Sequence, residues 1–386
     1  MYFLTKQDPN YSIKGSRDPL GFQVVWQAAG RKLIPFLSTV SGSIKDFQIL
    51  CLAYALKKEL KIEDKQFESF FLRFEQMMAY TRYKSYPKEG FNGVDKVRKM
   101  MSGNPATVKI SSAIADQLLS SQKAYGIWGK YNSPFSEMRL TEMSEFSNIF
   151  ISEVLNNDAF YYQASLLSKK RDAQVAYIEI EKMDQWTEML QKPTGEGKKL
   201  FVDKLLDDTC GKELLKQINK NLELRDLYLK NFDLFNLIRQ LIASSNNINF
   251  ISILEHIANT EKVICPLNRI FRYLQTKSYW KNEDIETDLY IKKWRTRFES
   301  KDFDETTRSL ATLLTLSNYD LVSGLVKRNE EVVARRNSAP WMQITEKGLE
   351  VNHFEGAFFR EEYDPETQND FNYFFSTFIS LHKQLN

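Results

Sequence analysis

The chain has 386 residues, of which 42% are hydrophobic and 13% aromatic, as in ordered globular proteins. Domains usually hold about 100–200 residues, so this length predicts two or three folded units. The 53 Lys and Arg residues nearly balance the 50 Asp and Glu residues. The overall charge therefore does not indicate a nucleic-acid or membrane partner. Evidence for such a partner has to come from local charged patches.

Two further features limit the class of protein. The longest apolar run, "FQILCLAYAL" at 47–56, is much shorter than the about 20 residues of a membrane span, and Asp8 and Pro9 interrupt the place where a secretory signal needs its apolar centre. We therefore expect a cytoplasmic protein without a membrane partner. The cysteines and histidines are few and scattered, namely Cys51, Cys210, Cys265, His256, His353 and His382. None of their spacings is that of metal ligands, so the sequence predicts no metal site and no cofactor.

In chain order, the first predicted elements are helices. A short helix runs through Trp26, and a longer one begins at Ile44. Large apolar residues then recur at helical spacing in a single stripe, Phe67, Phe70, Phe71, Phe74, Met77 and Met78. This spacing predicts a helix with one buried face.

Residues 91–146 have the order of a winged helix. The segments "VDKVRKMM" (94–101) and "SAIADQLLSSQKA" (112–124) are predicted helices, and Thr141 caps a further one. Between them, Gly126, Trp128 and Gly129 interrupt the helical pattern. We interpret 125–140 as the β-hairpin, or wing, with Trp128 at least half buried against the preceding helices.

The remainder is predicted to form a second, helical domain. The polar segment "QKPTGEGKK" (191–199) is the best linker, which gives an N-terminal helical domain at 1–190 and a C-terminal helical bundle at 200–386. A small hairpin is predicted within 339–358, and Phe371, Phe374, Phe375 and Phe378 predict a closing amphipathic helix. The fold class is thus mainly α.

Two basic groups are candidates for nucleic-acid contact. The first surrounds the expected wing and comprises Lys96, Arg98, Lys99, Lys123 and Lys130. The second is interleaved with aromatic residues and comprises Arg269, Arg272, Lys292, Lys293, Arg295 and Arg297. The acidic residues of 283–288 lie within the second group, so a solvated surface of ion pairs is the favoured interpretation there.

Two smaller sets complete the candidates. Trp128, Arg335, Arg336 and Trp341 are predicted interaction residues, although cations at the end of a helix are also explained by its dipole. Glu179 and Glu181 alternate in the expected strand 175–182, as paired carboxylates of a metal-dependent nuclease would. Their order relative to lysine does not fit that motif, so we expect them on the solvent face of a strand and predict no catalytic residue.

Three segments, "RDPLGFQVVWQAAGRKLIPFLSTVS" (17–41), "QKAYGIWGKY" (122–131) and "RRNSAPWM" (335–342), resemble segments of accessory proteins encoded beside ATPases or nucleases in bacterial anti-phage defence operons. The resemblance implies a bacterial cytoplasmic subunit of a defence complex. We therefore expect other protein subunits as partners, an ATPase or a nuclease among the candidates, and the basic groups make DNA a candidate ligand. The leading hypothesis is a non-catalytic subunit of a complex that senses or handles nucleic acid. The alternatives are a stand-alone winged-helix DNA-binding regulator and a nuclease that uses Glu179 and Glu181.

Overall fold

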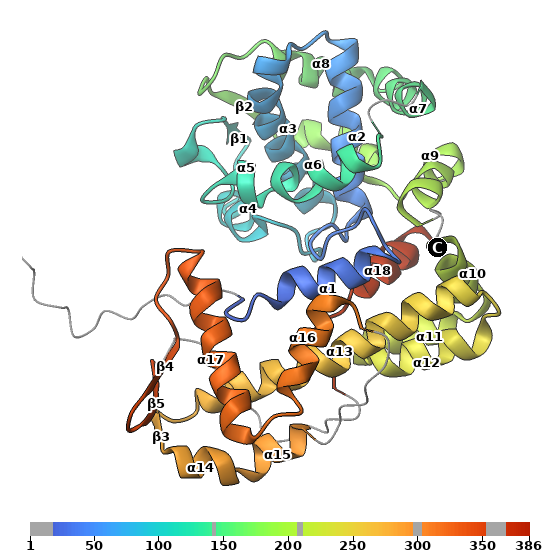
Figure 1. Ribbon diagram of the computed structural model, residues 1–386. Helices are drawn as coiled ribbons and strands as arrows, with labels where there is room; N and C mark the ends of the chain where they lie inside the picture. The colour runs from blue at the N-terminus through green and yellow to red at the C-terminus, as the bar shows by residue number, and fades with distance from the viewer. Residues whose placement is uncertain (1–17, 141–143, 207–210, 296–302, 353–367) are drawn as a thin grey trace, which may run out of the picture. The chain divides into compact units, whose positions relative to one another are not determined.

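The computed structural model describes residues 18–140, 144–206, 211–295, 303–352 and 368–386. These residues are mainly helical, with two small antiparallel sheets, which confirms the predicted class (Figure 1). The chain divides into two compact units, and each is discontinuous in sequence. Unit 1 comprises residues 1–35 and 216–373, and unit 2 comprises residues 36–215 and 374–386.

The predicted linker at 191–199 is part of a folded unit. Helix α9 (Gly195–Phe201) begins inside it, and Pro193 and Gly197 are buried. The transition from unit 2 to unit 1 lies instead at 215–216, within helix α10 (Gly211–Lys220). The polar, glycine-containing composition here belongs to the start of a helix and not to a linker, because Thr194 is the N-cap of α9 and Gly195 is its first residue.

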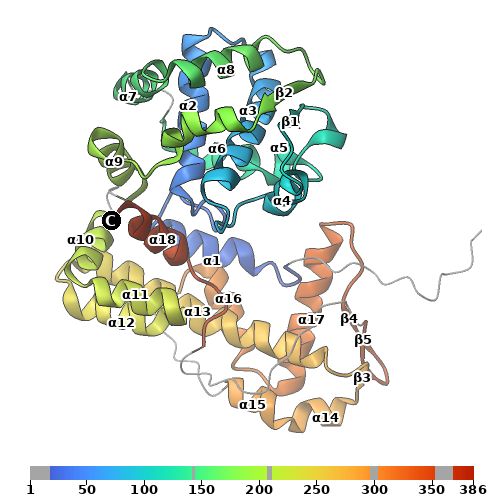
Figure 2. The ribbon, with the colours of Figure 1, turned by 180° about the vertical axis from the view of Figure 1, so that it is seen from behind.

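Unit 2 is built around two neighbouring helices, α2 (Ile44–Glu59) and α3 (Asp64–Ser85), which lie side by side in opposite views (Figures 1 and 2). The Ser43 hydroxyl accepts the Asp46 N–H at 3.3 Å and caps the start of α2. The predicted stripe of α3 is buried, from Phe67 to Met78. This confirms the helical spacing as the signal of a core-facing surface.

Shorter elements surround this pair. The helices are α4 (Val94–Met101), η1 (Ile114–Asp116), α5 (Gln122–Tyr125), α6 (Ile127–Glu137), α7 (Ser144–Leu155), α8 (Asp158–Ser168), η2 (Glu181–Leu190), α9, η3 (Val202–Leu206) and α18 (Phe375–Leu385). Strands β1 (Thr107–Ile110) and β2 (Ala176–Glu179) pair antiparallel, with Lys109 opposite Tyr177. Val108 and Ile178 face the core from this sheet.

The predicted wing is wrong. Residues 127–137 form helix α6, which meets α5 at a sharp corner at Gly126. A Cβ at Gly126 would lie 2.6 Å from a carboxylate oxygen of Glu75, and a Cβ at Gly129 would lie 2.1 Å from the carbonyl oxygen of Ala124. The glycines are there because two helices and the α3 side chain approach closely, and not because the chain turns into a hairpin.

The rest of the winged-helix order fails for related reasons. The predicted helix at 112–124 is replaced by η1, an irregular stretch and α5, while 107–110 is a strand whose partner β2 comes about 70 residues later in the chain. The prediction for Trp128 is confirmed. Its ring is mostly buried and lies 5.7 Å from that of Phe67 and 5.3 Å from that of Phe71.

Unit 2 closes with the last described segment. On α18, the Gln384 side chain accepts the N–H of Ile44 at 2.9 Å and donates to the carbonyl oxygen of Gly42 at 2.7 Å. The Thr377 hydroxyl donates to the carbonyl oxygen of Ser38 at 2.9 Å. The predicted closing helix is present, although it begins at Phe375 and leaves Phe371 and the N-cap residue Phe374 outside.

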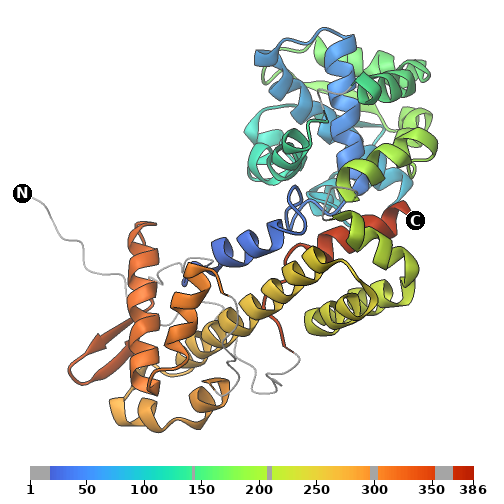
Figure 3. The same ribbon diagram turned by 45° about the vertical axis from the view of Figure 1, so that its right-hand side comes forward.

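Unit 1 is organised along the 27-residue helix α13 (Ile248–Leu274), which runs without a break past Pro266 (Figure 3). The other helices are α1 (Phe22–Arg31), α11 (Leu222–Asn231), α12 (Leu234–Ser244), α14 (Asn282–Thr287), α15 (Leu289–Arg295), α16 (Glu305–Leu313) and α17 (Asn318–Ala334). The predicted hairpin is confirmed as β4 (Met342–Thr345) and β5 (Gly348–Val351). It is joined by β3 (Tyr279–Trp280) in the order β3-β5-β4.

A buried carboxyl attaches residues 370–373 to α13. The Glu261 side chain accepts the N–H groups of Asp370 and Phe371 and the hydroxyl of Tyr373, the last at 2.7 Å. Asp370 in turn forms an ion pair with Arg269. Burial, followed by the charge of Asp370, raises the pKa of Glu261 to about 8.

Candidate functional site

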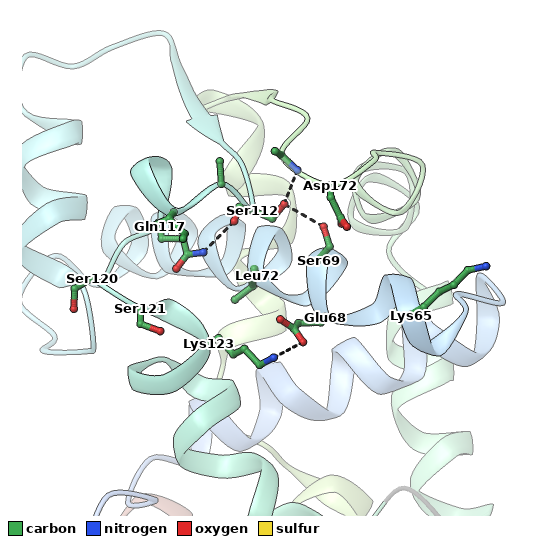
Figure 4. Close-up of a pocket in the computed structure, with 13 residues that line it drawn as sticks. Lys65, Glu68, Ser69, Leu72, Ser112, Gln117, Ser120, Ser121, Lys123 and Asp172 are labelled. Carbon is green, nitrogen blue, oxygen red and sulfur yellow. Dashed lines mark hydrogen bonds and ion pairs between the residues drawn. The ribbon is translucent and has the colours of Figure 1, made fainter. Parts of the chain in front are cut away.

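A cavity of about 570 Å³ opens in unit 2 between α3, residues 112–123 and the turn at 172–173 (Figure 4). Its uncharged polar lining consists of Ser69, Ser112, Gln117, Ser120 and Ser121. Its charged lining consists of Lys65, Glu68, Lys123 and Asp172. Its apolar lining consists of Leu72, Ala113, Ile114 and Ala173. We call it the serine cavity; its volume is within the range of about 300–1,000 Å³ that small-molecule sites have.

One wall is held in place by a single glutamine. The Gln117 side chain donates to the carbonyl oxygen of Ser112 at 3.0 Å and accepts the N–H of Gln122 at 2.8 Å. Both ends of its amide are thus used to join the start of this irregular stretch to α5. The wall is preorganised although it contains little regular secondary structure.

Behind the serines lies a buried guanidinium. Arg73 is 1% exposed and sits one turn along α3 from Ser69. It donates to the Ser69 hydroxyl at 2.8 Å, to the Ser112 hydroxyl at 3.3 Å and to the carbonyl oxygen of Lys170 at 2.9 Å. Burial lowers the pKa of Arg73, and the charge of Asp172 opposes this effect. Its hydrogen-bond acceptors are neutral oxygens, so the positive charge extends towards the cavity.

Ser112 is the side chain that this arrangement leaves ready for a ligand. Its hydroxyl oxygen accepts from the hydroxyl of Ser69 at 3.1 Å, from the N–H of Ala173 at 3.0 Å and from Arg73. Three donors exceed the two lone pairs of a hydroxyl, so a further bond requires Ser112 to donate its own hydrogen. No acceptor for that hydrogen is present among the described residues.

The charges at the cavity are partly paired. Lys123 forms an ion pair with Glu68 at 2.7 Å across the space next to Leu72 (Figure 4). Lys65 forms an exposed pair with Glu63 at 2.9 Å. Asp172 is exposed at the opposite side and forms no hydrogen bond with the described residues. The cavity therefore presents ammonium and hydroxyl donors together with one carboxylate that has not formed an ion pair.

The first predicted basic group is largely engaged within unit 2. Lys96 donates to the carbonyl oxygens of Gln117 and Ala115, and Arg98 pairs with Asp95 at 2.8 Å. Lys123 pairs with Glu68, and Lys130 donates to Asn92 at 2.6 Å. Lys99 is exposed on α4 and has no such contact among the described residues. The wing that was expected to bring these cations together is absent, and Lys123 is the member of the group that lines the serine cavity.

The second predicted group is dispersed. Arg269 is buried and paired with Asp370, whereas Arg272, Lys292 and Lys293 are exposed. The backbone of Arg295 ends α15, while Arg297 lies outside the described residues. Trp294, which Lys292, Lys293, Arg295 and Arg297 flank in the sequence, is 1% exposed and belongs to the core. Stacking of a nucleic-acid base on Trp294 is therefore excluded in this conformation.

The predicted interaction residues mostly make contacts inside their own unit. Arg336 donates to the carbonyl oxygen of Asp18 at 2.6 Å and lies 3.3 Å from its carboxylate. Trp341 is partly buried, its backbone N–H donates to the side-chain oxygen of Asn329 at 2.9 Å, and Trp128 packs on α3. Arg335 is exposed at the end of α17. Arg336, Trp341 and Trp128 therefore make contacts within their own units, whereas the Arg335 side chain forms no hydrogen bond or ion pair within the ranges that the structure describes.

The two candidate nuclease carboxylates do not share a strand. Glu179 ends β2 and pairs with Lys182 at 2.7 Å, while Glu181 begins η2. Both are exposed, but the predicted alternation stops at Glu179. In the described part of the chain, no three His, Cys, Asp or Glu side chains are grouped so as to hold a metal ion.

The serine cavity was missed in the sequence. The available signals were the paired serines at 111–112 and 120–121 and the single arginine, Arg73, inside the aromatic stripe of α3. An arginine on an apolar helix face is costly to bury, so it indicates a polar partner brought from elsewhere in the chain.

Comparison with known proteins gave no relative. No family model matches the chain, and neither a curated protein nor a solved structure resembles it significantly. Helices long and apolar enough to cross a membrane were not found among the described residues.

Proposed function

We propose that the chain is a cytoplasmic, non-catalytic subunit of a bacterial multiprotein complex that senses or handles nucleic acid, and that it binds a small polar ligand in the serine cavity. The observation that carries the binding role is the Ser112 hydroxyl. Its oxygen already accepts from three donors while it lines an open cavity. A ligand acceptor would satisfy the one hydrogen that the protein leaves over.

The same geometry favours binding over catalysis by this serine. A serine nucleophile needs a base that takes its proton and a lone pair that can attack. At Ser112 the neighbours are donors, and the guanidinium of Arg73 withdraws electron density from the oxygen. Ser112 is therefore suited to hold an acceptor and poorly suited to attack one.

The assembly role rests on the resemblance of the three segments to accessory defence proteins. Neighbouring genes that encode an ATPase or a nuclease, and stable copurification of that protein with the tagged chain from its native host, would support it. An isolated gene, together with a chain that stays monomeric in its host, would contradict it. Salt-sensitive binding of duplex DNA by the purified chain would favour the stand-alone regulator instead.

The binding role can be tested with methyl NMR, since Leu72 and Ile114 line the cavity. The chain would be titrated with nucleosides, nucleoside monophosphates and sugar phosphates. We expect at least one of these probes to shift the methyl signals of both residues. Ile248 is 83% exposed in unit 1 and serves as the matched control methyl. No shift at Ile114 with any probe would contradict the binding role, and conversion of the bound probe would contradict the non-catalytic role.

A further inference from the structure

From the arrangement of donors we infer, on the basis of the proposed function, that the serine cavity takes a phosphate-bearing ligand of nucleotide size. Its phosphate accepts from Ser112 and from the Lys123 ammonium and lies within the field of Arg73. Its less polar part lies against Leu72 and Ile114.

The hydrogen-bonding capacity that remains in the cavity is mainly donor capacity. Ser112 can only donate, and the ammonium of Lys123 spends one of its three hydrogens on Glu68. The hydroxyls of Ser120 and Ser121 line the same space. A phosphate offers several acceptor oxygens that point in different directions, so it can accept from donors on separate segments at once.

The charge distribution favours an anion near Ser112. Arg73 is buried and bonded to neutral oxygens, and the anion would be separated from it by one hydroxyl. Glu68 and Lys123 form an ion pair and together add no net charge, so Lys123 contributes the two remaining hydrogens of its ammonium and holds the Glu68 carboxylate compensated. Asp172 is the lining group that opposes an anion, since it is an acid without an ion pair among the described residues. Removal of the Asp172 charge should therefore strengthen the binding of an anion.

The volume exceeds what a free phosphate needs. A cavity of about 570 Å³ has room for a ring attached to the phosphate. Leu72 and Ile114 supply an apolar surface, and Ile114 is 77% exposed although it belongs to the lining. An apolar side chain held open at the edge of a polar cavity is suited to the face of a base or a similar ring.

The experiment compares the affinities of AMP, adenosine, inorganic phosphate and the 5′-carboxylate analogue of adenosine for the full chain by calorimetry, with the Ile114 methyl signal as the report of location. AMP should bind tightest. Lys123→Gln should weaken AMP by about tenfold, whereas Asp172→Asn should strengthen it several-fold, because the two changes shift the local charge in opposite directions. Lys99→Gln is the matched control at an exposed lysine of α4 and should leave the affinity unchanged.

The outcomes separate the inference from the proposed function. Adenosine that binds as tightly as AMP, or an Asp172→Asn variant that weakens AMP, would overturn the phosphate inference and keep the cavity as a ligand site. The same holds if the carboxylate analogue binds tighter than AMP. If none of the four probes moves the Ile114 signal, the phosphate inference fails, and the wider titration with other sugar phosphates decides the binding role. The Lys123→Gln and Asp172→Asn variants both replace exposed residues, so an unchanged melting temperature verifies that they fold.

Discussion

The Glu75 carboxylate on α3 accepts the backbone N–H of Ile127 at 2.7 Å, and so a side chain from a neighbouring helix caps the start of α6. Its second oxygen accepts from Gln122 at 2.9 Å, on α5. Glu75 therefore joins three helices at one buried point. Burial raises its pKa to about 7, since the two hydrogen bonds only partly offset the cost of a buried charge.

Removing this cap should destabilise unit 2. We expect Glu75→Ala to lower the free energy of unfolding by about 2–4 kcal/mol, because it leaves the Ile127 N–H and one N–H of the Gln122 side-chain amide buried without their acceptor. The other N–H of that amide keeps the carbonyl oxygen of Leu72. Chemical denaturation followed by circular dichroism measures this. Glu63→Ala is the control, since Glu63 is an exposed glutamate at the N-cap of α3 that makes no capping bond. Equal effects of the two changes would refute the role of the cap.

The corner between α5 and α6 should not tolerate a methyl group. Gly129→Ala would bring a Cβ to 2.1 Å from the carbonyl oxygen of Ala124, so the backbone has to move. We expect a loss of more than about 2 kcal/mol, which is typical of a steric clash that cannot relax. Gly90→Ala is the matched control, because no atom lies within 4 Å of the corresponding Cβ. A Gly129→Ala variant as stable as wild type would show that the corner can relax to admit a methyl group.

Unit 1 should lose stability as the pH rises through the range set by Glu261. The folded-state pKa of about 8 is above the usual value of 4.5, so the folded state binds more protons than the unfolded state between these pH values. Stability from this group is therefore full below about pH 4.5 and falls as the pH approaches 8. Over the whole interval the loss is on the order of 5 kcal/mol.

The Glu261→Gln variant removes this dependence. A glutamine can still accept the N–H groups of Asp370 and Phe371, and it can donate to the hydroxyl oxygen of Tyr373. We expect it to gain stability relative to wild type as the pH rises from 5 to 8. A constant difference between the two proteins across that range would show that Glu261 does not titrate there.

Duplex DNA should bind this chain weakly and with a small salt dependence. Lys96 and Lys130 are already bonded to protein oxygens, so Arg98 and Lys99 are the more accessible cations of the predicted group. Neutralising both with Gln should reduce the slope of log affinity against log salt by at most about 1.8. A larger reduction in a fluorescence-anisotropy titration would mean that α4 contacts DNA more extensively than its ion pairs suggest.

Sequence periodicity was sufficient to predict an element where the spacing of neighbouring residues decides its structure. The stripe from Phe67 to Met78, the bounds of α4 and the hairpin of β4 and β5 were all predicted from local spacing. It failed at 112–140, where long-range contacts decide. Gly126 is explained by Glu75, which lies about 50 residues earlier, and β1 is explained by its pairing with β2. Such contacts leave no local pattern to detect.

The candidate site was unpredictable for the same reason. Ser112 becomes a one-way donor only when Ser69, Arg73 and Ala173 converge on its oxygen from other segments. Nothing in its neighbours along the chain distinguishes it from other serines. The predicted basic group could be listed from the sequence, but whether each cation already has a partner could not.

The division of the chain at 35–36, 215–216 and 373–374 has a consequence for biosynthesis. Helix α18 supplies Gln384 and Thr377 to unit 2, although the ribosome makes it after nearly all of unit 1. Unit 2 therefore cannot complete its fold until unit 1 has been translated. Unit 1 in turn includes the residues up to 35, which are translated before unit 2. A nascent chain released early would leave unit 2 with an open apolar seam, which makes truncated products targets for chaperones and proteases.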